Sequence, residues 1–232
     1  MAIKVVQFKN IGIVTFSQNR RSKNIKISVK PDKSVLVSFP FYVSLKKVAK
    51  FVDKNEQWIR SQQEKYNEQK FMFEDGFVLK TKLYSITFIA GEKNKAEIKD
   101  SLIEITIDDF NKENSRLFIE KIITDVYRFE AKKILPAKLN ELANLNGFSF
   151  SRITIRNNKR NWGSCSSKNN ISLNLQMMKL PDELIDYILL HELVHTEVKN
   201  HGPQFWERLN QVSDNRAREL SKQVKQFSTY NL

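Results

Sequence analysis

Four residues of this 232-residue sequence have the types and the spacing that metal-dependent hydrolysis needs. His191 and His195 lie four positions apart, Glu192 follows the first of them, and His201 is the third and last histidine of the chain. On an α-helix, positions i and i+4 lie one turn apart on the same face, so two imidazoles at this spacing can bind one ion. Glu192 would project beside the ion, where its carboxylate can take a proton from a metal-bound water. The H-E-x-x-H pattern therefore predicts a catalytic zinc site on a helix.

The third protein ligand has more than one candidate. His201 is favoured because its imidazole has no other evident use in the sequence. The alternative is a carboxylate from a downstream helix: Glu207, Asp214 or Glu219. Three protein ligands leave the fourth position of a tetrahedral zinc for water, as in catalytic sites. Three imidazoles suit zinc well, although other divalent ions also bind imidazole.

The spacing of the three histidines equals that of the metzincin pattern, but Val198 stands where those enzymes have glycine. Valine is disfavoured in a left-handed turn because its side chain is branched at Cβ. We therefore expect the turn at Lys199–Asn200, where asparagine tolerates the left-handed conformation. No methionine turn follows, so the metzincin family is disfavoured.

Helices must position these side chains. The helix that carries the motif is predicted to begin near Pro181–Asp182, because proline is favoured in a first turn. A second helix is predicted from Gly202–Pro203, with Phe205 and Trp206 packed behind His201. A final, more polar helix is expected at about 214–226.

Alternating apolar residues predict strands in the first part of the chain. Ile25–Val29 and Val35–Phe39 should pair as a hairpin, with Pro31-Asp32-Lys33 as its turn. Ser44 can cap a helix that runs to about Glu68.

The middle of the chain combines further strands with one long helical region. Two or three strands are predicted between Gly76 and Ile107, followed by a helical region from Asn111 to Leu145. Pro136 should kink or split this region, and Gly147 stands where a C-terminal cap is expected. Further strands are predicted at Ile153–Ile155 and Ile171–Leu175. We recognise no internal repeat in the sequence.

These elements predict an α+β fold. Residues 1–110 should form a β-rich, basic N-terminal region with one helix, and residues 111–232 should form the domain that carries the H-E-x-x-H helix.

Charge and cysteine content narrow the functional classes. Residues 1–70 carry 15 Lys and Arg against 5 Asp and Glu, whereas the whole chain has a net charge of +13. This asymmetry suggests a surface for nucleic acid or for an acidic partner, with a solvated basic face as the alternative. One cysteine, Cys165, cannot form an intramolecular disulfide, which favours a reducing compartment. With no signal-peptide pattern and no stretch of about 18 apolar residues, we expect a cytoplasmic protein without a membrane span.

The region around the motif resembles the YgjP-like metallopeptidases, relatives of the SprT and WLM families in the zincin group. The residues that carry the resemblance are Arg160-Asn161-Trp162-Gly163-Ser164-Cys165-Ser166, Asn174, Pro181, Asp186-Tyr187, the HELVH motif, Asn200-His201 and Phe205-Trp206. The resemblance implies a zincin-like catalytic domain and zinc-dependent peptidase activity. It carries the metal ligands over onto His191, His195 and His201, and the catalytic carboxylate onto Glu192.

Several neighbouring residues are candidates for accessory roles. Arg160, Asn174 and Tyr187 are the candidates for stabilising the oxyanion that forms during attack. Asp186 could pair with Arg160 or, like Glu197, could orient an imidazole. Cys165 is predicted to be a structural, buried thiol beside a tight turn at Gly163 and the packed side chain of Trp162.

The leading hypothesis is a zinc metallopeptidase in which Glu192 is the general base for a zinc-activated water. Its peptide substrate could add as a strand along an exposed edge near Ile171–Met177. The alternatives are a SprT-like protease associated with nucleic acid through the basic N-terminal region, and a hydrolase of non-peptide amides. Glu192 argues against a metal-bound interaction module without turnover, because such a module needs no general base.

Overall fold

The computed structural model describes residues 3–30, 33–68 and 73–229. The chain divides into two compact units, Met1–Phe71 and Met72–Leu232, and each is described by itself. The sequence predicts a boundary at residue 110, whereas the structure has it near residue 71. The difference arises because Ile86, Phe88 and Ile105 share one core with the helices that follow residue 110.

The N-terminal unit is built on a four-stranded sheet. Its strands are β1 (Ile3–Phe8), β2 (Gly12–Gln18), β3 (Lys26–Val29) and β4 (Val35–Phe39). The strand order is β1-β2-β4-β3, with β2 and β4 parallel and the two outer pairs antiparallel. The antiparallel β3–β4 pair confirms the predicted hairpin, while Pro31 and Asp32 of its predicted turn lie outside the described residues.

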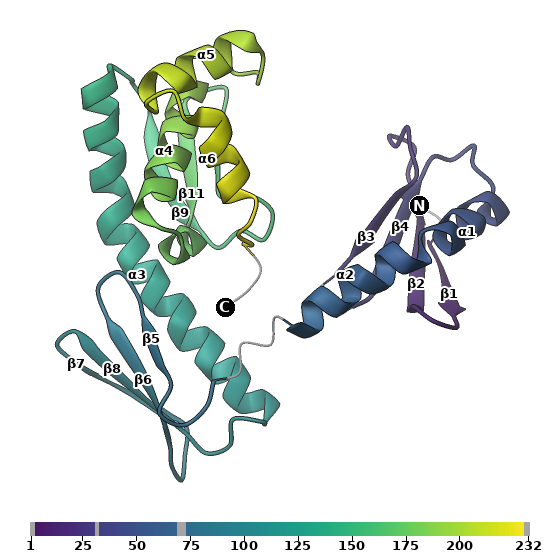
Figure 1. Cartoon of the computed structure of the whole chain (residues 1–232), viewed down its shortest axis with the longest axis horizontal. Helices are drawn as coiled ribbons and strands as arrows, with labels where there is room; N and C mark the ends of the chain where they lie inside the picture. The colour runs from purple at the N-terminus through teal and green to yellow at the C-terminus, as the bar shows by residue number, and fades with distance from the viewer. Residues whose placement is uncertain (1–2, 31–32, 69–72, 230–232) are drawn as a thin grey trace. The chain divides into compact units, whose positions relative to one another are not determined.

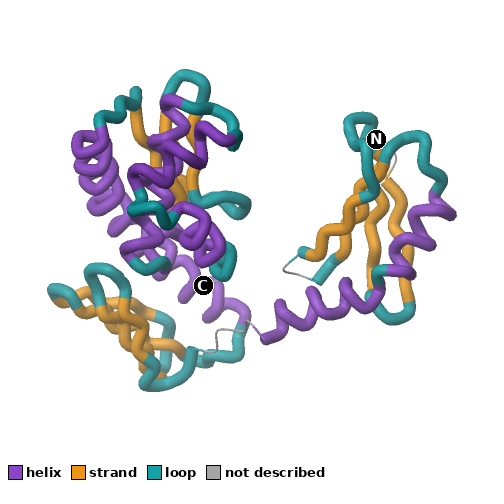
Figure 2. Tube along the Cα trace, turned by 45° about the horizontal axis from the view of Figure 1, so that its top comes forward, coloured by secondary structure: helices purple, strands orange, loops and turns teal. Residues whose placement is uncertain are grey.

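Two helices pack on one face of this sheet, α1 (Leu45–Lys54) and α2 (Glu56–Glu68). Ser44 caps α1 as predicted, because its Oγ accepts a hydrogen bond from Lys47 N at 3.4 Å. The single helix predicted to run to Glu68 is interrupted at Asn55, whose side-chain amide donates to Phe51 O at 2.7 Å. In Figure 2 the two helices lie along one side of the four strands.

The second unit begins with a sheet of the same topology as the first. Its strands are β5 (Val78–Lys80), β6 (Ser85–Ala90), β7 (Lys95–Lys99) and β8 (Leu102–Ile107). The order β5-β6-β8-β7, with a parallel central pair between two antiparallel pairs, repeats the order of the first sheet. Each sheet is followed by a helix that packs on it. The structure therefore contains a repeat that the sequence does not reveal.

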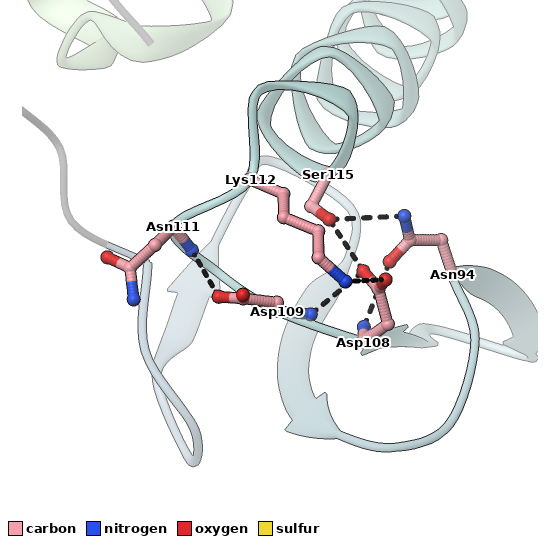
Figure 3. Close-up of polar contacts among 6 residues, drawn as sticks. All are labelled: Asn94, Asp108, Asp109, Asn111, Lys112 and Ser115. Atoms are coloured by element: carbon pink, nitrogen blue, oxygen red, sulfur yellow. Dashed lines mark hydrogen bonds and ion pairs between the residues drawn. The ribbon is translucent and has the colours of Figure 1, made fainter.

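A hydrogen-bonded cluster joins β8 to the long helix α3 (Glu113–Asn146), as Figure 3 shows. The Asp108 carboxylate accepts a hydrogen bond from Ser115 Oγ at 2.7 Å and pairs with Lys112 Nζ at 2.8 Å. Asn94, from the connection between β6 and β7, accepts from Asp108 N at 3.0 Å. These bonds fix the position at which the helix leaves the sheet.

Helix α3 continues through Pro136, so the predicted split does not occur. Proline removes only one backbone hydrogen bond, and the fully buried Leu135 and Leu139 on either side hold the helix by packing. Gly147 ends the helix with a φ of 73°, as predicted for a C-terminal cap. The sheet β5–β8 lies beside one half of α3, and the remaining elements of the unit lie beside the other half (Figure 1).

Those remaining elements are a three-stranded sheet and a group of helices. They are β9 (Arg152–Arg156), β10 (Gly163–Cys165), β11 (Asn170–Asn174), the 3-10 helix η1 (Leu175–Lys179), α4 (Asp182–Glu197), α5 (Pro203–Val212) and α6 (Ala217–Val224). Helix α6 begins later than predicted, because Asp214 and Asn215 adopt left-handed backbone conformations with φ of 49° and 60°. The α+β class is confirmed. None of the helices in the described part of the chain is both long enough and apolar enough to cross a membrane.

Candidate metal centre

The side chains that converge closely enough to hold a metal ion, among the described residues, are the three histidines. His191 and His195 lie on one face of α4, and His201 lies in the connection to α5. His201 Nε2 is 3.1 Å from Nε2 of His195 and 3.1 Å from Nε2 of His191. Nitrogens bound to one tetrahedral zinc lie roughly 3.3 Å apart. The three imidazoles therefore fit a single zinc ion.

The connection between α4 and α5 differs in detail from the prediction. Val198 is extended, with φ −120° and ψ 104°, and follows directly on the last helical residue. Asn200 is not among the residues with a left-handed backbone, so the predicted left-handed turn is wrong. The chain reverses here without one because an extended residue leaves the helix first.

A backbone hydrogen bond and burial leave imidazole nitrogens available to bind a cation. His195 Nδ1–H donates to Val198 O at 3.0 Å, which leaves the lone pair of Nε2 directed at the other two rings. Burial, followed by the neighbouring His195 and His201, lowers the pKa of His191 to about 3. Burial also lowers the pKa of His195. The rings of His191 and His195 are therefore neutral near pH 7, as a metal ligand must be.

Glu192 is buried, with 5% of its surface exposed, and burial raises the pKa of its carboxyl to about 8. Its Oε2 is buried without a hydrogen-bond partner in the described part of the chain. An unpartnered buried carboxylate oxygen costs free energy unless a cation, a water or a substrate completes its contacts.

A small cleft of about 260 Å³ joins these groups. It is lined by the three histidines, Glu192, Lys199 and the residues of β10. β10 is the outer strand of its sheet, in the order β10-β11-β9. One wall of the cleft is therefore the edge of a β-sheet.

Gly163 of β10 lies in contact with the Glu192 side chain. A Cβ atom at this position would stand 2.7 Å from Glu192 Oε1 and 2.8 Å from Glu192 Cγ. Glycine is thus required by the close approach of the carboxylate, and the predicted tight turn at Gly163 is instead a strand. Sequence reasoning missed this role, because nothing in the sequence says that residue 163 faces the H-E-x-x-H helix.

The Phe205 side chain packs against all three imidazoles. Its fully buried ring lies with its centroid 4.8, 4.5 and 4.7 Å from those of His191, His195 and His201. The Phe205 ring centroid also lies 5.7 Å from that of Trp206. The prediction that Phe205 packs behind His201 is confirmed, and its contact extends to the whole histidine cluster.

The match to known protein families decides the classification of this chain. The YgjP-like metallopeptidase domain matches residues 23–227. The chain belongs to the YgjP-like metallopeptidase family. It is accordingly a metal-dependent peptidase, and a peptidase acts on peptide or protein substrates.

Two solved structures are similar to part of this YgjP-like chain. The metallopeptidase zymogen abylysin of Pyrococcus abyssi is 23% identical, with 43% of this chain and 99% of that chain covered and a TM-score of 0.38. The metallopeptidase zymogen jannalysin of Methanocaldococcus jannaschii is 30% identical, with 40% and 94% covered and a TM-score of 0.36. A search of curated proteins found no match.

Two of the residues predicted to stabilise the oxyanion in this YgjP-like domain, Asn174 and Arg160, belong to or contact the loop before β10. Asn174 is buried, and its amide donates to Asn158 O and to Asn161 O, which holds the loop before β10. Its amide group is thus engaged by the backbone. Arg160 lies exposed in the same loop, outside the lining of the cleft.

Tyr187 and Asp186, one turn before His191 on α4, also lie outside the lining of the cleft. The Tyr187 ring packs 6.2 Å from the His191 ring, and its hydroxyl hydrogen-bonds to Ser221 of α6. Asp186 pairs with Lys138 of α3 at 2.7 Å, so the proposed pairing with Arg160 does not form.

The remaining acidic candidates are also engaged elsewhere. Glu197 pairs with Arg208 at 3.0 Å and does not orient an imidazole. Among the alternative third ligands, Glu219 pairs with Arg216 at 2.6 Å. Neither Glu207 nor Asp214 belongs to the converging group.

Cys165 is half-buried and lines the cleft, so its thiol is less buried than predicted. Burial raises the pKa of its thiol, against a lowering effect of Lys199, whose Nζ lies 3.9 Å from Sγ. Lys199 also donates to Ser166 O at 3.1 Å and to the Asn169 side chain. These bonds connect the α4–α5 loop to the β10–β11 turn. The sequence does not predict this role, because Lys199 lies in a polar stretch without a recognisable motif.

Proposed function

We propose that this YgjP-like peptidase uses zinc, held by His191, His195 and His201, with Glu192 as the general base. The observation that supports the proposal is the convergence of three ring nitrogens beside a buried carboxylate that lacks a partner. A bound zinc ion would supply Lewis-acid polarisation of the scissile carbonyl and would lower the pKa of a water to about 7.

The residues of the chain would then divide the work. Glu192 takes the proton of the attacking water and delivers it to the leaving amine. Its burial keeps bulk water away from that proton, and Gly163 leaves room for the carboxylate. The Val198 carbonyl holds the His195 ring in the tautomer that presents Nε2.

The peptide would bind along the outer edge of β10. The sequence favours an edge near Ile171–Met177, but β11 is the central strand and pairs with β10 on one side and β9 on the other. The predicted edge at Ile171–Met177 is therefore wrong, because neighbouring strands are hydrogen-bonded to both edges of β11. The edge of β10 lines the cleft, so a peptide added there would lie beside Glu192.

Experiments can distinguish two alternative functions from this proposal. Hydrolysis of a small non-peptide amide would use the same groups, because the site fixes the chemistry but not the length of the substrate. Association with nucleic acid was suggested by the basic N-terminal residues, and the family match adds no support for it. A cytoplasmic location remains a prediction from the sequence.

The test is elemental analysis of the purified protein together with cleavage of fluorescent casein and of small amides. We expect about one zinc per chain in the wild type and in Glu192→Gln, and a strong loss of zinc in His201→Ala. Casein cleavage should fall by at least about a hundredfold in Glu192→Gln. A wild-type protein that takes up no zinc would refute the proposed centre. Cleavage of amides but not of casein would favour the alternative hydrolase.

A further inference from the structure

The N-terminal unit contains a groove that the proposed peptidase chemistry does not use. Its volume is about 310 Å³, and it lies between β3 and the two helices of the unit. The residues that line it are Ile25, Lys26, Ile27, Phe51, Asn55 and Trp58.

Aromatic side chains are unusually exposed around this groove. Trp58 is 47% exposed and Phe51 is 36% exposed, although both line the groove. Phe41 and Tyr42 are 62% and 68% exposed, and the Tyr42 hydroxyl donates to Lys23 O at 3.2 Å. This bond places the aromatic pair near the start of β3. Exposed single apolar residues are common, but Phe51 and Trp58 line one hollow together, and such a grouping indicates a binding surface.

The groove runs beside a strand with a free edge. β3 is the last strand in the order β1-β2-β4-β3, so within the described residues no strand pairs with its outer side. Lys30 N donates to Ser34 O at 2.9 Å, and hydrogen-bonded pairs alternate along an antiparallel ladder. The N–H and C=O of Ile27 therefore point away from β4. An extended peptide can hydrogen-bond to such an edge.

The segments that line the groove carry an excess of positive charge. Residues 20–30 and 45–59, which hold the lining residues, carry nine Lys and Arg against two acidic residues, Asp53 and Glu56. A groove with apolar side chains and such surroundings complements a ligand that combines acidic and apolar groups.

We propose that this groove binds an extended, acidic segment of another polypeptide, which adds as a strand along β3. Its apolar side chains pack on Phe51 and Trp58, and its carboxylates lie near Lys26 and the lysines of α1. A protein ligand fits better than RNA. Sheets that bind RNA stack bases on aromatic residues of their open face. Here the open-face side chains of β2 and β4 include Thr15, Ser17 and Ser38 and no aromatic residue, while Phe51 and Trp58 line the groove.

The test uses the full-length Glu192→Gln protein, so that the probe is not cleaved. The probe is a fluorescein-labelled ten-residue peptide in which glutamate alternates with valine and phenylalanine, measured by fluorescence anisotropy. Its controls are the same peptide with lysine in place of glutamate, and a labelled fifteen-nucleotide oligothymidylate. We expect the acidic peptide to bind and both controls to bind at least tenfold more weakly.

Variants locate the bound peptide. Trp58→Ala should weaken binding at least about tenfold, because truncation of an aromatic anchor removes a large part of the binding free energy. Lys26→Glu should weaken it by repulsion, and Ile27→Pro should weaken it by removing the outward N–H. Val5→Ala is the matched control, since Val5 is 60% exposed on the opposite edge strand β1.

The proposal fails if the acidic peptide does not bind, or if the lysine peptide binds equally well. It also fails if Trp58→Ala and Lys26→Glu leave binding unchanged while circular dichroism shows a folded protein. Oligothymidylate binding that Trp58→Ala abolishes would assign the groove to nucleic acid instead. None of these outcomes depends on the zinc chemistry of the second unit.

Discussion

Glu192 and Gly163 lie against each other, although 29 positions separate them in the sequence. Strand β10 brings the glycine to the cleft, and α4 brings the glutamate. The position of the proposed general base thus depends on a residue without a side chain, because any Cβ at residue 163 would occupy the space of the carboxylate.

We predict that Gly163→Ala lowers kcat by about a hundredfold, because the displaced carboxylate no longer reaches the proton of the attacking water. Zinc content should stay near that of the wild type, since the histidines are not displaced. Casein cleavage and elemental analysis on the same preparation measure both effects.

Gly202→Ala is the matched control for this substitution. Gly202 has an ordinary φ of −77°, and a Cβ there would meet no atom within 4 Å. We expect Gly202→Ala to keep most of the activity. Equal activities of the two alanine variants would show that the Gly163–Glu192 contact does not position the base.

At the scale of elements, the junction between β8 and α3 is held by the Asp108 cluster (Figure 3). Hydrogen bonds from Lys112 and Ser115 hold the pKa of Asp108 at about 2, below its usual value of 3.8. A carboxyl group with a depressed pKa in the folded state stabilises that state above the unfolded pKa. The stabilisation is lost as pH falls from about 4 through about 2.

We therefore predict that Asp108→Asn lowers the melting temperature at pH 7 and that its difference from the wild type shrinks as pH falls from 4 to 2. Differential scanning calorimetry at several pH values measures the difference. In the Lys112→Ala background the pH dependence of the difference should be smaller, because the hydrogen bond of Lys112 is the largest cause of the low pKa. A difference that stays constant from pH 7 to pH 2.5 would contradict this assignment.

At the scale of the whole molecule, the predictable parts were those with strong local patterns. The H-E-x-x-H spacing placed His191 and His195 on one face of a helix, and alternation in Ile25–Val29 and Val35–Phe39 predicted the β3–β4 hairpin. Ser44 and Gly147 are predictable as caps, because their roles depend on neighbours a few residues away.

The parts that could not be predicted depend on contacts between distant residues. Strand β10 is only three residues long and pairs with β11, so its sequence carries no period that identifies a strand. The continuation of α3 through Pro136 depends on packing on both sides of the proline. The repeated sheet topology is likewise hard to recognise, because a match as short as Thr15-Phe16 in β2 and Thr87-Phe88 in β6 does not by itself indicate a repeat.

The two units have separate cores, and this separation leads to a prediction about unfolding. Ile59 is fully buried in the core of the first unit, and Ile105 is fully buried in the core of the second. Replacement of either side chain by alanine should cost about 2–5 kcal/mol of stability in its own unit. Zinc stabilises only a unit that binds it in the folded state, so added zinc should raise the unfolding transition of the second unit alone.

Calorimetry with and without zinc should therefore give opposite patterns for the two variants. Ile105→Ala should lower the zinc-dependent transition, whereas Ile59→Ala should lower the transition that does not respond to zinc. The substitutions are matched in residue type and in burial, so the difference reports the unit and not the chemistry of the side chain. If Ile59→Ala shifted the zinc-dependent transition as much as Ile105→Ala does, the two cores would unfold as one cooperative structure. The repeated sheet-and-helix arrangement would then describe topology alone, without independent stability.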